Sequence, residues 1–350
     1  MSPMIPQSTA QVEPLSLIKH IQHSDDWRTQ LRTAYRSPGQ LLAALDFNRQ
    51  QILTMTASDQ GFNTLVPHAF VEKMAKQDAN DPLLLQVLPQ AAEAIAHPDF
   101  NTDPLQEASF NPQPGVVHKY KGRALLITAG HCAINCRYCF RRHYPYGEQR
   151  RARSEWQQSL AYIQQQTDIE EVILSGGDPL ALTDSQLFEI ITAIEAITHI
   201  KRLRIHSRLP IVLPARITPE LCQRLANSRL TCVIVVHANH ANELGEDVAQ
   251  ACNLLRQHGV QLLNQSVLLA QVNDSLAALK DLSERLFELG VLPYYLHLPD
   301  HVAGTTHFFV SLERGQALVA QMQATMSGYL VPKLAREEPG KTSKTVYAKA

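Results

Sequence analysis

Apolar and polar residues recur along this chain with two different periods, and the change between them divides it into regions. Between residues 16 and 96 the apolar positions have the spacing of amphipathic helices, interrupted at Pro38 and Pro82. A polar stretch with several prolines follows, up to residue 114. The pattern therefore predicts a helical region and a linker over residues 1–114.

Beyond this linker, short runs rich in β-branched residues alternate with amphipathic helical stretches. Six runs predict strands: Ala124–Thr128, Glu171–Ser175, Arg202–His206, Cys232–His237, Gln261–Leu268 and Leu292–Leu298. Strands that alternate with helices indicate parallel strands joined by right-handed crossovers. The expected fold class is α/β, with a partial (β/α)6 barrel over residues 115–305.

Residues 306–350 predict a C-terminal extension. One amphipathic helix is expected near Leu312–Met326, and the polar tail after it, with its glycine, proline and lysine residues, is predicted to form no core element. In β/α barrels the reactive residues collect where strands end and loops begin. Chemistry is therefore expected in the loops after the six predicted strands.

Composition limits the function classes. A formal net charge of -1 and 19% charged residues give no strong field for nucleic acid or an anionic membrane surface. No apolar run approaches the roughly 20 residues of a membrane-spanning helix, and the amino terminus lacks the pattern of a signal peptide. We expect a cytoplasmic globular protein with no membrane and no nucleic-acid partner.

Cysteine spacing carries the strongest chemical signal. Cys132, Cys136 and Cys139 fall inside eight residues, in the loop after the first predicted barrel strand, whereas the other three cysteines are scattered through apolar stretches. Three thiolates can hold three irons of a four-iron cluster and leave the fourth iron open to an outside ligand. Zinc is the alternative, for which His131 or His143 would supply a fourth ligand.

The spacing Cys-x3-Cys-x2-Cys, with an aromatic residue inside it, resembles the radical S-adenosylmethionine superfamily, whose open iron binds S-adenosylmethionine. The block Ser175-Gly176-Gly177-Asp178, which follows the second predicted strand, is similar to that superfamily's glycine motif. Glycines have no Cβ, so their amide and carbonyl groups can approach a ligand closely. Without this context, a Gly-Gly-Asp sequence would indicate only a turn.

Over most of the barrel and tail, the resemblance narrows to the lysine 2,3-aminomutases. The matching blocks are CRYCFRRHYPY, LSGGDPL, RLRIHSRLPIVLPARIT, HANHANE, LLNQSVLL, PYYLHLPD and SGYLVPKL. The resemblance implies an isomerase that moves an amino group on free L-lysine, with a [4Fe-4S] cluster, S-adenosyl-L-methionine and pyridoxal 5'-phosphate as cofactors and a reductase or flavodoxin-type electron donor.

Three short blocks, HSRLPIV, YLHLPD and YLVPKLARE, look most like one branch of that family. This branch makes (R)-β-lysine for the modification of elongation factor P. The resemblance therefore also implies a functional link to elongation factor P and to the ligase that transfers the lysyl group.

Family positions that bind pyridoxal phosphate and the other cofactors carry over to particular residues. Pyridoxal phosphate needs a lysine amine, and the position that matches the family's lysine is Lys344, with Lys341 as the competing candidate. Arg123 resembles a phosphate-binding arginine, and His237 and Gln265 match cofactor-contact positions near strand ends. Taken alone, a His or Gln at a strand end is more often a satisfied polar core residue.

Three residues match the family's substrate contacts. Arg141 corresponds to the arginine that binds the substrate carboxylate, and a planar guanidinium suits bidentate contact with such a group. Asp300 and Glu337 correspond to the acids that hold the distal ammonium, although the family often has Asp where Glu337 stands. The alternative for Arg141 is a solvated basic face, formed by the six arginines between residues 137 and 153.

Other functions remain open at this level. A free L-lysine 2,3-aminomutase of catabolism or osmolyte synthesis is the close alternative. An RNA-modifying radical enzyme would carry a clearer basic surface and would have no use for the tail lysine. A non-catalytic iron–sulfur or zinc-binding protein is the most distant alternative.

Overall fold

A single curved sheet runs through the part of the chain that the computed structural model describes, residues 27–56, 62–144 and 153–347. Its nine strands follow one another in chain order. They are β1 (Val116–Tyr120), β2 (Arg123–Ala129), β3 (Glu171–Gly176), β4 (Arg202–Ser207), β5 (Thr231–Val236), β6 (Gln261–Val267), β7 (Leu292–His297), β8 (Lys333–Arg336) and β9 (Thr345–Val346). Strands β2 to β8 are parallel, and β1 and β9 pair antiparallel at the two edges.

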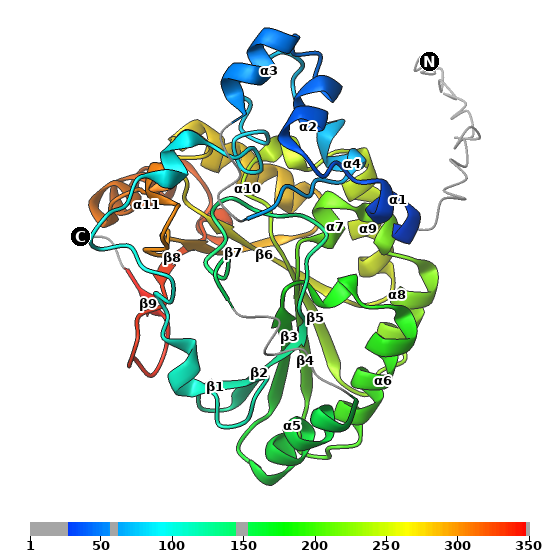
Figure 1. Ribbon diagram of the computed structural model, residues 1–350. Helices are drawn as coiled ribbons and strands as arrows, with labels where there is room; N and C mark the ends of the chain where they lie inside the picture. The colour runs from blue at the N-terminus through cyan, green and yellow to red at the C-terminus, as the bar shows by residue number, and fades with distance from the viewer. Residues whose placement is uncertain (1–26, 57–61, 145–152, 348–350) are drawn as a thin grey trace, which may run out of the picture.

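Helices connect successive parallel strands and cover the outside of the sheet (Figure 1). They are α5 (Arg153–Gln165), α6 (Asp184–Glu195), α7 (Leu209–Val212), α8 (Pro219–Ala226), α9 (Glu246–Gln257), α10 (Leu276–Glu288) and α11 (Leu312–Thr325). Each of the longer helices buries one apolar stripe; in α6 it includes Leu187, Ile190 and Ile194. The main core therefore lies between these helices and the sheet. Among the described residues, no helix is long and apolar enough to cross a membrane.

The predicted partial barrel is confirmed, and the six predicted strands are β2 to β7, each within one residue of its expected bounds. The prediction for the tail was wrong. Lys333–Arg336 form a seventh parallel strand, in which Leu334 pairs with Leu296 of β7 and is buried. A segment of four residues with a charged residue at each end is too short to show the alternation of a strand. The strand therefore forms through pairing with β7, which the local sequence does not indicate.

Four short helices form the N-terminal region: α1 (Trp27–Thr33), α2 (Pro38–Ala44), α3 (Arg49–Met55) and α4 (His68–Val71). Residues 16–26, which were also expected to be helical, lie outside the described residues. After α4 the expected α-helix gives way to turns, because the Asp81 carboxylate accepts hydrogen bonds from the backbone amides of Leu83 and Leu84. This turn brings Gln86 to the barrel, where its carbonyl accepts from the Arg137 amide at 2.8 Å.

Alternation along the strands decides which side chains face the barrel interior. In β4, Leu203 and Ile205 are buried against the helices, whereas Arg204 and His206 line an interior cavity. The same period places Gln265 of β6 on the cavity wall. The interior of the barrel therefore contains a cavity of about 500 Å³, lined by both polar and apolar side chains.

Candidate active site

All fourteen predicted site residues line this one cavity. They are Cys132, Cys136, Cys139, Arg123, Arg141, Ser175, Gly176, Gly177, Asp178, His237, Gln265, Asp300, Glu337 and Lys344. The competing Lys341 is exposed and does not line the cavity. The structure thus brings together residues from the cysteine loop, from several strand ends and from the tail.

The three thiols of the cysteine loop mark one end of the cavity. Burial raises the pKa of Cys132 far above its usual range and that of Cys139 to about 12. Cysteines bind metal as thiolates, so metal binding here must displace protons. Among the described residues, no three His, Cys, Asp or Glu side chains are grouped as a single metal ion requires. A four-iron cluster takes its thiolates at separate corners, so each of the three cysteines can bind a different iron.

Buried arginines hold this loop in place. Arg137 Nε donates to Glu93 Oε1 at 2.8 Å, and Arg142 Nη2 donates to Glu93 Oε2 at 2.7 Å. Arg137 is fully buried and Arg141 nearly so. The alternative of a solvated basic face is wrong for these three arginines, and residues 145–152 lie outside the described part of the chain.

The glycine turn after β3 packs directly against the segment that leads into Cys132. A Cβ on Gly177 would lie 2.3 Å from the carbonyl oxygen of His131, and one on Gly176 would lie 2.7 Å from that of Ala129. The Gly177 amide also donates to Ala129 O at 2.7 Å. The two glycines are therefore required for close packing of the cysteine loop, whatever ligand their backbone contacts.

Asp178, the last residue of the predicted glycine motif, ties this turn to the end of β4. Its carboxylate accepts from Ser207 Oγ at 2.7 Å and from the Arg208 amide at 2.7 Å. Burial raises the pKa of Asp178 to about 6, against the effect of these hydrogen bonds. Both oxygens thus have partners within the protein, and a direct cofactor contact by Asp178 stays a prediction.

Tyr138, inside the cysteine loop, connects that loop to His237. Its hydroxyl accepts from Arg208 Nη1 at 2.6 Å and from Asn239 Nδ2 at 2.7 Å. The hydroxyl hydrogen is then left to donate to His237 Nε2 at 2.9 Å, which assigns the proton of the ring to Nδ1. Burial lowers the pKa of His237 to about 3, so this ring is neutral. Gln265, by contrast, has no side-chain hydrogen bond among the described residues.

Ion pairs define the other end of the cavity. Lys344 Nζ lies 2.9 Å from Glu337 Oε2, and Lys119 Nζ lies 3.2 Å from Glu337 Oε1. Burial alone would raise the pKa of Glu337, but the two lysines outweigh it and lower that pKa to about 2. Glu337 is therefore ionised and already balanced by two cations, so its carboxylate is less available to a substrate ammonium than the sequence predicted.

Asp300 differs from Glu337 in having no side-chain hydrogen bond within the described part of the chain. Burial raises its pKa to about 7, although the nearby Lys344 lowers it in part. A cation that enters the cavity would stabilise the ionised form. Asp300 is thus the acid at this end that still lacks a counter-charge in direct contact.

The same end carries cations that fit a phosphate. Arg123 stacks over the Tyr120 ring at 4.6 Å, and its guanidinium has no hydrogen-bond partner among the described residues. Arg204 donates to Glu171 at 2.7 Å, but its buried Nε has no hydrogen-bond partner among the residues that the structure describes. With the Lys344 amine close by, these donors fit pyridoxal phosphate, which presents an aldehyde and a phosphate.

Arg141 is already occupied by a carboxylate of this chain. Its Nε and Nη2 donate to the two oxygens of Glu107 at 2.8 and 2.6 Å, and its Nη1 donates to Ser175 Oγ at 3.3 Å. This bidentate contact is the geometry predicted for the substrate carboxylate. A substrate would therefore have to displace Glu107, whose position in the predicted linker gave no signal of this contact.

Several cavity residues received no role from the sequence. They include Lys119, Tyr120, Arg204, Arg208 and Tyr295. For Arg204 and Tyr295, the alternation along the strand was the available signal, because it places them on the same strand faces as His206 and His297, which also line the cavity. Arg208 follows β4, and only the folded chain shows what it contacts.

A cysteine loop after the first parallel strand and a glycine turn after the second, both facing one barrel cavity, define a radical S-adenosylmethionine enzyme. In agreement, the family model described as Radical SAM superfamily matches residues 126–282. The chain belongs to the lysine 2,3-aminomutase family. This family consists of isomerases whose cofactors are a [4Fe-4S] cluster, S-adenosylmethionine and pyridoxal phosphate.

Three relatives illustrate the match. The L-lysine 2,3-aminomutase of Escherichia coli is 48% identical over 92% of this chain and 94% of its own length. That of Haemophilus influenzae is 46% identical over 94% of this chain and 97% of its own. That of Clostridium subterminale is 32% identical over 94% of this chain and 80% of its own. The chain is thus closer in sequence and in length to the first two.

Proposed function

We propose that this protein converts L-α-lysine to (R)-β-lysine for the modification of elongation factor P. One observation supports the reaction above all: the three thiols and Lys344, the lysine proposed to bind the aldehyde, line a single cavity. A reaction that needs a cluster-bound cofactor and pyridoxal phosphate on the same substrate requires such a shared space.

The proposed cluster ligands are Cys132, Cys136 and Cys139. Ser175, Gly176, Gly177, Asp178, His237 and Gln265 are proposed to surround S-adenosylmethionine beside them. When bound, the cluster and S-adenosylmethionine supply a radical that removes a hydrogen atom, and pyridoxal phosphate supplies the carbonyl group that carries the migrating nitrogen.

Lys344 is the proposed covalent anchor of pyridoxal phosphate, and Arg123 is proposed to bind its phosphate. The ion pair with Glu337 keeps the Lys344 amine at the cavity wall. Because Lys119 shares the same carboxylate, Glu337 stays paired when Lys344 reacts. This arrangement supports a role for Glu337 in holding the lysine, in addition to its proposed contact with the substrate.

Substrate orientation is proposed to come from opposite charges at the two ends of lysine. Arg141 would take the carboxylate in place of Glu107, and Asp300 would take the distal ammonium. The Asp300 carboxylate, which has no side-chain hydrogen bond within the described part of the chain and whose pKa is raised by burial, supports this assignment. A substrate with an acidic side chain would instead place a second anion against Asp300.

The three blocks that look most like the elongation factor P branch support this assignment. The close alternative is a free lysine aminomutase that feeds catabolism or osmolyte synthesis. We also propose a cytoplasmic location and a flavodoxin-type electron donor, since the substrate reaction requires a one-electron reductant.

To test the branch, elongation factor P and its lysyl-transferring ligase are incubated with the product of the enzyme. Intact mass spectrometry should show transfer of the enzymatic product to elongation factor P well in excess of transfer from α-lysine. Equal transfer from both isomers would favour the free-lysine alternative.

A further inference from the structure

A buried polar network surrounds one cysteine of the proposed cluster site and leaves the other two outside it. Its centre is Arg208, which follows β4 and is 7% exposed. Arg208 Nη1 donates to Cys136 Sγ at 2.7 Å and to the Tyr138 hydroxyl at 2.6 Å. A guanidinium is cationic at any physiological pH, so a fixed positive charge lies against this sulfur.

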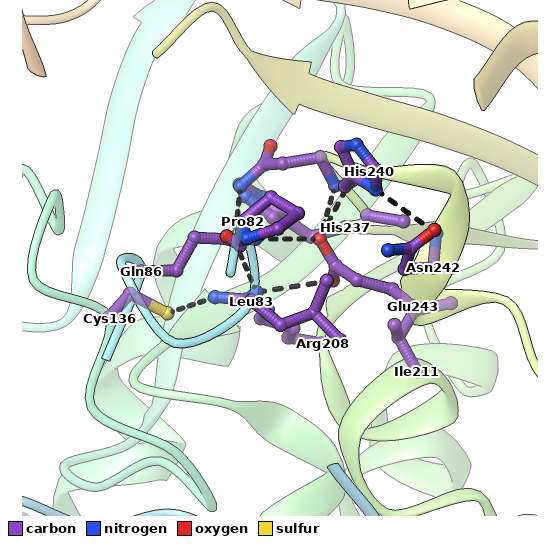
Figure 2. A network of polar contacts seen from close by, with 12 residues as sticks. Pro82, Leu83, Gln86, Cys136, Arg208, Ile211, His237, His240, Asn242 and Glu243 are labelled. Atoms are coloured by element: carbon purple, nitrogen blue, oxygen red, sulfur yellow. Dashed lines mark hydrogen bonds and ion pairs between the residues drawn. The ribbon is translucent and has the colours of Figure 1, made fainter. Parts of the chain in front are cut away.

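The opposite edge of the guanidinium is clamped from two other parts of the chain. Arg208 Nη2 donates to Gln86 Oε1 at 2.7 Å and to Glu243 Oε2 at 3.2 Å. Figure 2 shows Cys136 on one side of Arg208, with Gln86 and Glu243 at the other contacts. Four of its five N–H groups thus have partners, and the buried Nε has none among the described residues.

Glu243 is itself held in one orientation. It is fully buried, and its Oε1 accepts from the Asn239 amide at 2.8 Å, the His240 amide at 3.1 Å and Gln86 Nε2 at 3.1 Å. Its carboxylate cannot turn toward the sulfur without losing these bonds. The pair is therefore oriented, with the cation at Cys136 and the anion behind it.

We propose that Arg208 is a positioning residue that raises the reduction potential of the iron–sulfur cluster through its charge and hydrogen bond at Cys136. This inference rests on the proposed cluster site. One-electron reduction adds one negative charge to the cluster and its thiolates, with the electron coming from an external reductant. A cation at a ligand sulfur stabilises the reduced form more than the oxidised form.

The test is an anaerobic redox titration with dithionite, followed by the electron paramagnetic resonance signal of the reduced cluster. In Arg208→Gln, the ratio of reduced to oxidised cluster at a given potential should fall about tenfold, which is about 59 mV for one electron. Arg208→Lys retains the charge and should shift the potential less. Glu243→Gln removes the counter-charge and should shift it in the opposite direction.

Arg216→Gln is the matched control, because Arg216 is also buried but pairs with Asp184 and donates to the Leu180 carbonyl instead of to a cysteine of the loop. Its potential should equal that of the wild type. An unchanged potential in Arg208→Gln, or an equal shift in Arg216→Gln, would overturn the inference. If Arg208→Gln does not fold, the reduction potentials of Arg208→Lys and Glu243→Gln provide the test. Potentials that are unchanged in both variants would overturn the inference.

Failure of the proposed function would look different. Wild-type protein, reconstituted with iron and sulfide, would then show no reducible four-iron signal at all. If the wild type shows the signal and the variants have the wild-type potential, the proposed cluster site is retained and only the role of Arg208 is rejected.

Discussion

The cysteine end and the lysine end of the cavity are built on different principles. At the cysteine end, strand-end loops and the N-terminal turn that carries Gln86 form a continuous buried hydrogen-bond network. At the lysine end, Glu337 joins Lys119 from β1 to Lys344 from the tail through ion pairs, and Asp300 has no direct partner in the described residues. Most polar groups around Cys136 have partners within the described part of the protein, whereas the lysine end has charges that a ligand can rearrange.

This difference fits the two kinds of cofactor. A cluster needs ligands held still, because its potential depends on the hydrogen bonds and charges around the sulfurs. A lysine that reacts with an aldehyde, and a pocket that admits and releases substrate, need groups that can exchange partners. Substitutions at the two ends are therefore expected to differ in the size of their effects.

The largest effect is expected at the cysteine end. Cys136→Ala should remove the visible absorbance of the cluster and lower aminomutase activity to background, because three thiolates are needed to hold it. Cys222→Ala is the control, since Cys222 is a core residue that should cost only about 1 kcal/mol of stability. Iron and acid-labile sulfide analysis makes the comparison, and a full cluster in Cys136→Ala would contradict the assignment.

At the lysine end, Lys344→Ala should abolish both activity and the absorbance of protein-bound pyridoxal phosphate. The fold should persist, because Glu337 keeps its contact with Lys119. Lys341→Ala, at an exposed position of the same tail, should behave as wild type. Borohydride reduction and peptide mapping locate the anchor, and a pyridoxyl label on Lys341 alone would reverse the assignment.

A smaller loss is expected for Asp300→Asn. Removing the charge that faces the substrate ammonium should cost about 2 kcal/mol, or roughly thirtyfold in kcat/KM for lysine. With norleucine, which has no ammonium, the two proteins should differ little. Equal lysine efficiency in a folded Asp300→Asn protein would show that Asp300 does not bind the ammonium.

Asp300 should also make lysine binding depend on pH. Because burial raises its pKa to about 7, it is mostly neutral at pH 6 and mostly ionised at pH 8. Only the ionised form attracts the ammonium, so the ratio of the lysine KM in wild type to that in Asp300→Asn should fall as pH rises through 7. A ratio that is flat from pH 6 to 8 would contradict the raised pKa.

The smallest effect is expected at Arg141. Glu107→Gln removes the carboxylate that now competes for this guanidinium, so the KM for lysine should fall by about fivefold, the equivalent of roughly 1 kcal/mol. Arg141→Gln should have the opposite effect. A higher KM in Glu107→Gln would mean that Glu107 supports the site instead of occupying it.

The sequence predicted the barrel, and a set of residues that line one cavity, better than it predicted the tail and the polar network. Apolar runs such as Glu171–Ser175 are long enough to show a strand, and family positions such as Lys344 carry over by spacing. The segment that forms β8 is too short to show the apolar pattern of a strand, and no family position indicated it. The contact between Arg208 and Gln86 joins residues far apart in the chain, so no local pattern indicates it.

The proposed reaction requires one cavity to join a reducible cluster to a lysine substrate bound to pyridoxal phosphate. The most direct test is chiral amino-acid analysis after anaerobic incubation of the reconstituted protein with L-lysine, S-adenosylmethionine and dithionite. We predict that (R)-β-lysine forms and that omission of S-adenosylmethionine prevents it. If protein with a full cluster and bound pyridoxal phosphate makes no β-lysine under these conditions, the proposed function is wrong.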